Sequence, residues 1–139
     1  MARTQLRPGI TMTRWAWATL LALASSPAMA EWVRVGDAGN AEVFVDRSSI
    51  VRTGDSATMW SVYALKTPGS ANGKAYVSLK RQDEFDCKGL RTRGVQISAH
   101  PQPMGEGPAV ASEKGTAAWT AVAPDSLIEM LLKTDCEKE

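Results

Sequence analysis

The stretch YVSLKRQDEFDC, residues 76–87, decides the fold through the alternation of its side chains. Successive residues of a β-strand point to opposite faces of the sheet. One parity here is mostly apolar and holds Val77, Leu79, Phe85 and Cys87, and the other holds Ser78, Lys80, Gln82, Glu84 and Asp86. The stretch therefore predicts the longest strand of a sheet, with its apolar parity on the core.

Shorter runs of the same kind lie on both sides of this strand, separated by turn residues. We expect a hairpin of residues 32–35 and 42–46, a strand at 58–66, another at 90–99 and a short one at 118–122. Residues 67–73 contain Pro68, Gly69 and the Asn72-Gly73 pair, so a loop is expected there. Residues 101–117, rich in proline and glycine, are expected to form a flexible loop.

After residue 122 the apolar period changes to that of a helix. The expected helix face consists of Leu127, Ile128, Leu131 and Leu132. Residues 124–126, Pro-Asp-Ser, are helix start signals. The predicted core contacts join Leu127, Ile128 and Leu131 to Val77, Leu79 and Phe85. The predicted fold class is α+β, an antiparallel β-sheet meander with a C-terminal α-helix packed on one face.

The N-terminus has the composition of a secretory signal peptide. Three arginines and no acid precede an apolar run at residues 15–24, and Ala28 and Ala30 bracket Met29 before a cleavage site. The run is too short for a membrane span, which needs roughly 20 residues. We therefore expect a cleaved segment at residues 1–30, one mature domain at 31–139 and no transmembrane helix. The domain is expected in the periplasm, at the cell surface or outside the cell, and no cysteine near the cleavage site would accept a lipid.

The charge balance argues against a basic nucleic-acid binder. The chain has 16 Lys and Arg residues against 15 Asp and Glu residues. Because three arginines belong to the expected signal peptide, the mature part has 13 basic and 15 acidic side chains. No nucleic-acid partner is expected.

Both cysteines, Cys87 and Cys136, lie in the expected mature domain, and an even count in a small exported chain predicts one disulfide. Cys136 comes just beyond the expected helix, so the bond would tie the helix end to the long strand. A zinc site lacks ligands, because one His and two distant Cys do not make a Cys/His set. A catalytic Cys87–His100 pair is a formal alternative that needs a free thiol. No metal or cofactor is expected.

Charged side chains gather on strand 76–87 and on the strand after it. Adjacent carboxylates such as Asp83, Glu84 and Asp86 can bind Ca²⁺ or share a proton. Alternation, however, turns Asp83 away from the other two, and nearby basic residues can neutralise all three. Arg91 and Arg93 share one parity and could present two guanidinium groups to an acidic ligand or a polysaccharide sulfate. In the alternative interpretation, they balance the acids within the sheet.

Trp60 and Trp119 also have two interpretations. Both could be ligand platforms, but a small sheet-plus-helix core needs large apolar side chains, so core positions are the default expectation. Catalytic equipment is scarce, because no serine stands in a nucleophile elbow and the single histidine leaves few options for a general base. A non-enzymatic protein is expected.

A series of short motifs runs through the expected mature domain. They are EWVRVG at residues 31–36, VFVDRSSI at 43–50, Gly54-Asp55, MWSV at 59–62, FDC at 85–87 with Arg91 and Arg93 after it, and a late Trp119 and Pro124 before a short helix and Cys136. In this order they resemble the surface-adhesin protein E-like family. The resemblance implies an antiparallel sheet with a disulfide-bonded helix. It also implies a surface adhesin that binds host matrix proteins such as vitronectin and laminin, and plasminogen.

Three functions stay open on the sequence alone. The first is an exported binding module of the adhesin type. The second is a periplasmic structural or complex-forming protein, and the third is an inhibitor of an extracellular hydrolase. The inhibitor would need an exposed rigid loop, for which residues 101–108 are the candidate.

Overall fold

The computed structural model describes Gly9 and residues 30–137. The predicted signal peptide therefore lies almost entirely outside the described residues. Within them, the chain forms a meander of antiparallel strands followed by one helix, as the alternation of residues 76–87 predicts.

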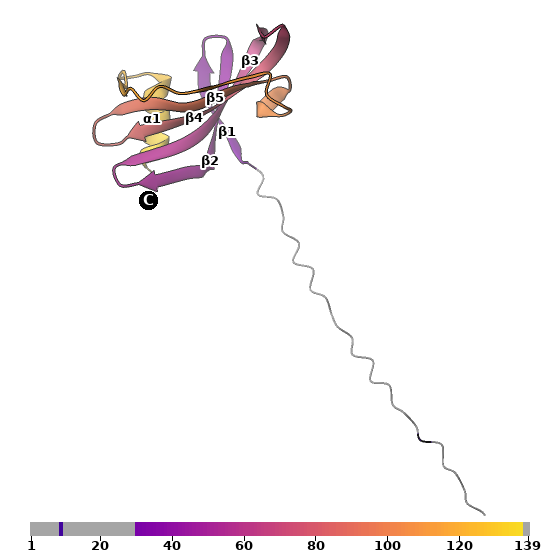
Figure 1. Ribbon diagram of the computed structural model, residues 1–139. Coiled ribbons are helices and arrows are strands. Elements are labelled where there is room, and N and C mark those ends of the chain that lie inside the picture. Colours follow the sequence, from indigo (N-terminus) through magenta and orange to yellow (C-terminus); the bar gives the residue numbers. More distant parts are fainter. Residues whose placement is uncertain (1–8, 10–29, 138–139) are drawn as a thin grey trace, which may run out of the picture.

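The strands lie in the sheet in the order β1-β2-β3-β4-β5-β6, so each pairs with its neighbour in sequence (Figure 1). A short seventh strand, β7, pairs with β5 on the same side as β6. Their bounds are β1 Trp32–Ala38, β2 Ala41–Thr53, β3 Ser56–Ala71, β4 Lys74–Asp86, β5 Arg91–His100, β6 Ala111–Lys114 and β7 Thr120–Ala121. The predicted antiparallel sheet and the short strand at 118–122 are confirmed.

Two predictions about these strands are wrong. Residues 67–73 do not form a loop, and the strand at 76–87 is not the longest strand of the sheet. β3 has 16 residues against 13 in β4, and it continues through Pro68 to Ala71. A register shift between Ala64 and Gly69 takes up the irregularity that the proline introduces. The turn itself is only Asn72-Gly73, whose φ angles of 53° and 71° match a two-residue hairpin turn.

Residues 101–117 do not form the predicted flexible loop. They contain a short 3₁₀ helix, η1 (Pro103–Gly105), and β6, which pairs with β5. The Ser78 hydroxyl of β4 donates to the Gln102 carbonyl at 2.7 Å and accepts from the Gly105 N–H at 2.9 Å. These bonds hold η1 on one face of the sheet, which the proline and glycine content did not indicate.

The helix α1 (Leu127–Cys136) lies on the other face of the sheet (Figure 1). It begins after Ser126, whose side chain accepts from the Glu129 N–H at 3.1 Å. Glu129 in turn accepts from the Asp125 N–H and pairs with Lys133 at 2.8 Å. The start signals at residues 124–126 are therefore confirmed, and Cys136 is the last residue of the helix rather than the first one beyond it.

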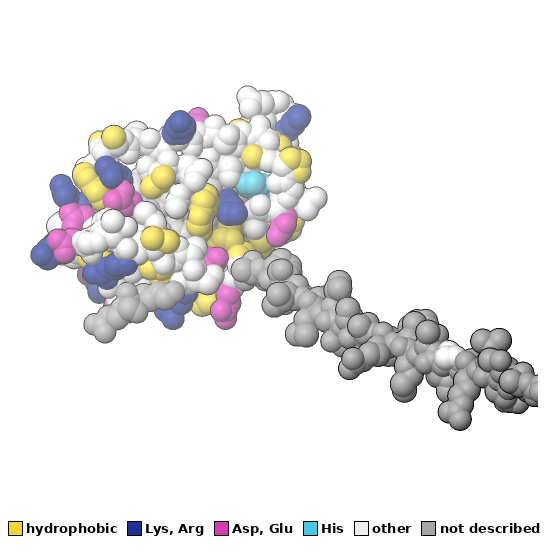
Figure 2. All heavy atoms as spheres, turned by 60° about the horizontal axis from the view of Figure 1, so that its bottom comes forward, with side chains coloured by type: hydrophobic (Ala, Val, Ile, Leu, Met, Phe, Trp, Pro, Cys, Tyr) yellow, Lys and Arg dark blue, Asp and Glu magenta, His cyan; other side chains and the backbone are white. Residues whose placement is uncertain are grey.

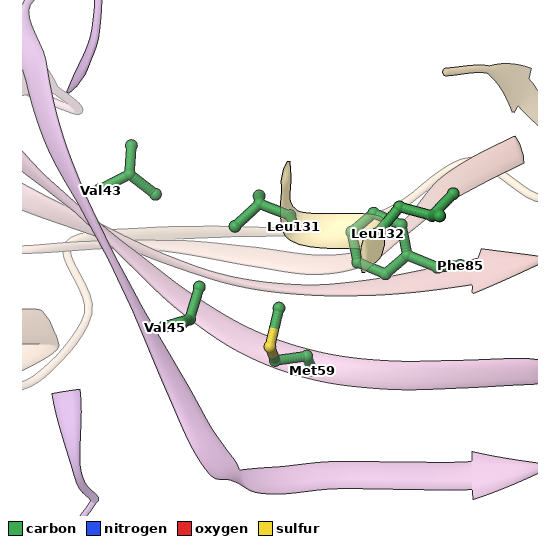
Figure 3. Close-up of a cluster of buried hydrophobic side chains, with 6 residues drawn as sticks. All are labelled: Val43, Val45, Met59, Phe85, Leu131 and Leu132. Carbon is green, nitrogen blue, oxygen red and sulfur yellow. The ribbon is translucent and has the colours of Figure 1, made fainter. Parts of the chain in front are cut away.

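The core fills the space between α1 and the strands beneath it (Figure 3). Its buried members are Val43, Val45, Met59, Phe85, Leu131 and Leu132. Phe85 and Leu131 are each 1% exposed, which confirms their predicted inward position, and Leu127 and Ile128 pack against this cluster.

The predicted core contacts of Val77 and Leu79 are wrong. Both are only partly buried and lie outside the core cluster. A helix of 10 residues is about 15 Å long. It therefore covers the half of β4 near Phe85 and leaves the other half of that apolar parity uncovered.

The predicted disulfide joins Cys87, just after β4, to Cys136 at the end of α1. Their Cα atoms lie 5.7 Å apart and the bond closes a separation of 49 residues. The helix end is thus covalently tied to the turn between β4 and β5. Because the thiol of Cys87 is consumed, the catalytic Cys87–His100 alternative is wrong.

Candidate protein-binding surface

Arg91 and Arg93 lie on the sheet face opposite α1, which we call the open face. In the register of β4 and β5, Arg91 pairs with Asp86 and Arg93 with Glu84. Side chains of directly opposed residues share a face. The parity prediction is thereby confirmed, and both guanidinium groups reach the same surface.

Each of these arginines forms an ion pair with the acid across from it. Arg91 Nη2 is 2.6 Å from Asp86 Oδ2, and Arg93 Nη2 is 2.7 Å from Glu84 Oε2. The arginine side chains are 47% and 33% exposed, whereas the acids are 16% and 18% exposed. The acids are therefore more deeply buried than the arginines that pair with them.

Asp86 also organises the turn after β4. Its carboxylate accepts from the Gly89 N–H at 2.8 Å and from the Lys88 N–H at 3.1 Å. These bonds, the one from Gly89 above all, together with Arg91, lower the pKa of Asp86 below its ordinary value. The lowered pKa keeps Asp86 ionised, and its carboxylate fixes the position of the Arg91 guanidinium.

Trp119 covers the two arginines. The Arg93 and Arg91 guanidinium carbons lie 4.4 Å and 5.1 Å from the centre of its ring. Trp119 reaches them because β7 pairs Ala121 with Arg91, and Trp119 is two residues away on the same side. We call Arg91, Arg93, Trp119, Glu84 and Asp86 the Arg–Trp cluster.

A second aromatic pair lies further along the open face. The ammonium of Lys80 is 5.0 Å from the ring centre of Trp60. Gln82, which is opposite Trp60 in the register, accepts a hydrogen bond from Gln96 at 3.0 Å. Both Trp60 and Trp119 are half-buried and outside the core cluster, so the default expectation of core positions is wrong.

The acidic cluster of β4 is divided between the two faces, as predicted. Asp83 lies on the α1 side, 7% exposed by side chain, with Arg81 Nη2 at 2.7 Å. Its partner Arg81 also lies over the Tyr63 ring at 5.4 Å. Burial raises the pKa of Tyr63.

In the part of the chain that the structure describes, no three His, Cys, Asp or Glu residues are grouped as a metal site would require.

His100 has a structural role next to η1. It is 8% exposed, and its Nδ1 lies 2.9 Å from the Gly107 carbonyl while its Nε2 lies 2.7 Å from the Ser98 hydroxyl. The ring therefore fixes the segment after η1 to β5. Its two nitrogens are both occupied by these contacts.

The surface around these groups has no dominant sign of charge. Figure 2 shows basic and acidic side chains interspersed over one side of the molecule. A hollow of about 420 Å³ lies elsewhere, between the end of β1 at Gly36-Asp37 and the start of α1. The Arg–Trp cluster is thus a surface for contact rather than a cleft.

Two residues of interest were missed by sequence reasoning. The sequence does not place Trp119 beside the arginines, because a strand of two residues is too short to indicate that β7 pairs with β5. Asp135 lies on the buried side of α1 and is 0% exposed. Its spacing of four from Leu131 and seven from Ile128 places an acid on the apolar helix face, which is a signal that the sequence did contain.

These features define a small disulfide-bonded α+β domain with a half-open sheet. The chain belongs to the surface-adhesin protein E family, whose sequence model matches residues 32–137. Among proteins with curated descriptions, none matches this chain. In the described part, no helix is long and apolar enough to span a membrane.

Solved structures of Haemophilus influenzae protein E have the same fold. Crystal form II of that protein matches with a TM-score of 0.65 and 15% identity, over 76% of this chain and 87% of the other. The structure of protein E from non-typeable Haemophilus influenzae matches with a TM-score of 0.63 and 16% identity, over 80% of each chain. At this identity the likeness establishes the fold alone.

Proposed function

We propose that this protein is an exported, non-enzymatic binding module that attaches to a host matrix protein through its open face. Membership of a family of surface adhesins supports the adhesive role. The target class is that of vitronectin, laminin or plasminogen, which the family resemblance implies.

The Arg–Trp cluster is the observation that carries the choice of surface. Arginine and tryptophan are the residues that most often dominate the energy of protein interfaces. Here they are held in place before any partner binds, since each guanidinium has a carboxylate partner and an aromatic neighbour. Less side-chain entropy is then lost when a partner binds.

The ion pairs leave the arginines able to bind. A guanidinium has five N–H donors, and the bonds to Asp86 and Glu84 use Nε and Nη2 of each arginine. Because the side chains of Arg91 and Arg93 are 47% and 33% exposed, a partner can still reach them. Because each cation is paired with an acid, the cluster is close to neutral and suits a mixed polar protein surface better than a polysaccharide sulfate.

A binding assay with the exported protein tests this proposal. Immobilised vitronectin, laminin and plasminogen are each titrated with the protein up to about 10 μM, where ΔG is near −7 kcal/mol. We expect one of them to bind and the double variant Arg91→Ala, Arg93→Ala to weaken that binding at least about tenfold. Trp119→Ala is expected to do the same.

Arg34→Ala is the matched control. Arg34 is also an exposed arginine in an ion pair, 3.0 Å from Asp37, but it lies on β1, away from the cluster. Its loss should leave binding unchanged. Equal binding by the double variant would place the site elsewhere, and no binding by the unmodified protein would contradict the adhesin proposal.

The cellular location distinguishes this proposal from the periplasmic one. A surface or medium pool of the protein supports adhesion. Retention inside the periplasm, measured by fractionation, would instead favour a structural or complex-forming role.

One observation favours the hydrolase inhibitor as a second candidate. The segment 101–108 has exposed residues at its ends, yet Ser78 and His100 fix its backbone at Gln102, Gly105 and Gly107. Rigid exposed loops of this kind are what an inhibitor needs. Titration of extracellular proteases with the protein, without loss of their activity, would exclude this candidate.

A further inference from the structure

Asp135 is an acid buried in the seam between α1 and the sheet. It lies in the last turn of the helix, beside the disulfide, and it is 0% exposed. Neither carboxylate oxygen has a hydrogen-bond partner among the described residues, and the same holds for the hydroxyl of Ser61 on β3, which is 2% exposed. Buried polar groups without partners are rare and costly, so this one calls for a role.

The charges that act on Asp135 come from two of the strands beneath α1. Asp83 of β4 is a buried like charge, although Arg81 partly neutralises it through bonds of 2.7 Å and 3.2 Å. Arg52 of β2 is an opposite charge, but it is exposed and donates to the Cys136 carbonyl at 2.6 Å. Arg52 therefore marks the solvent edge of the seam.

Burial acts most strongly on this carboxyl. It raises the pKa of Asp135 to about 7, with Arg52 opposing the shift and Asp83 adding to it. The seam thus accepts the neutral carboxyl and rejects the carboxylate. An ionised Asp135 gains by moving outward to water and to Arg52.

We propose that Asp135 is a proton-operated latch, which holds the last turn of α1 against the sheet when protonated and releases this turn when ionised. The disulfide limits the motion, because Cys136 stays bonded to Cys87 in either state. Release is therefore a local opening of the seam over Leu131, Leu132 and Phe85 rather than departure of the helix. The latch is independent of the binding function proposed above.

The sign of the effect follows from linkage. In the open state the carboxyl titrates near its ordinary value of 3.8, whereas in the closed state it titrates at about 7. The opening constant is then lowest below about pH 4, rises roughly tenfold per pH unit up to about pH 7 and levels off above it.

Hydrogen exchange of the exported, disulfide-bonded protein measures this opening. Amides of Thr134, Asp135 and Cys136, whose helical bonds form the last turn, are followed from pH 4.5 to 8 and corrected for intrinsic exchange. We expect their protection to fall about tenfold per pH unit up to about pH 7. In Asp135→Asn this pH dependence should disappear, whereas in Glu129→Gln, which removes a partly exposed carboxyl from the same helix, it should persist.

Identical pH profiles for the wild type and Asp135→Asn would overturn the latch. If that variant does not fold, the Asp135 carboxyl carbon is titrated by NMR in the wild type. A midpoint between about 6 and 8 supports the proposal. A midpoint below about 5 would overturn it, since the carboxyl would then be ionised in the closed seam.

Discussion

Phe85 has the largest fully buried side chain among the described residues. It is 1% exposed and contacts the cluster that α1 covers. We expect Phe85→Ala to lower the free energy of unfolding by roughly 3–5 kcal/mol, measured by urea denaturation, because it leaves a cavity that the core closes only in part. Leu79→Ala, on the same strand parity but beyond the helix, should cost clearly less. A loss under about 1 kcal/mol for Phe85→Ala would place this ring outside the core.

Three carboxyls with shifted pKa values set the pH of greatest stability. Bonds from Gly89 and Arg91 lower the pKa of Asp86, and Lys133 with the Asp125 N–H lowers that of Glu129. Their stabilisation is present above about pH 4 and is lost as the pH falls through their folded-state pKa values. Asp135 acts in the opposite sense, and its stabilisation is lost as the pH rises toward about 7. Urea denaturation at a series of pH values should therefore show a maximum at about pH 4–5, and Asp135→Asn should move it toward neutrality.

The sequence indicates that Arg91 and Arg93 share a face and could balance acids within the sheet, but it does not identify their aromatic neighbour. Strand parity fixes which side chains share a face, and charges opposite each other on one face attract. Trp119 comes from a two-residue strand whose pairing depends on the path of the preceding loop. Strand parity does not predict that path.

Gly115 allows the chain to pass close to β5 between β6 and Trp119. A Cβ at Gly115 would lie 1.7 Å from the Gly94 carbonyl oxygen, so the chain leaving β6 runs along the edge of β5 too closely for any residue but glycine. We expect Gly115→Ala to destabilise the protein by more than about 2 kcal/mol and to release Trp119 from the arginines. Gly94→Ala is the matched control, since its nearest neighbours would be 3.8 Å away. Urea denaturation and Trp fluorescence measure both effects, and equal stability of the two variants would contradict this account.

The elements themselves were predictable where one local signal decided them. Alternation gave β4, and the start signals with the apolar spacing gave α1. β3 was cut short at Pro68 because proline normally ends a strand, whereas here a register shift accommodates it. The reach of α1 over Leu79 was overestimated because the number of helical turns, rather than the helix period, decides which strand positions are covered.

The disulfide acts on the molecule as a whole. It closes 49 residues, from the turn after β4 to the end of α1, and so restricts the unfolded chain. Replacing Cys87 and Cys136 together by serine should cost about 2–5 kcal/mol in the free energy of unfolding. Urea denaturation with and without reductant measures the cost, and a loss below about 1 kcal/mol would mean that the core alone determines stability.

We expect the start of the mature protein to be set by processing during export. The Ala28-Met29-Ala30 site predicts cleavage before Glu31, and the folded domain begins directly afterward, with β1 at Trp32. Mass spectrometry of the protein from its native envelope should therefore give a mature chain that starts at Glu31. That chain should carry an intact disulfide, two mass units below the reduced form, because the bond forms only in an oxidising compartment. A chain that retains residues 15–30 would contradict the signal peptide and, with it, the exported binding module proposed here.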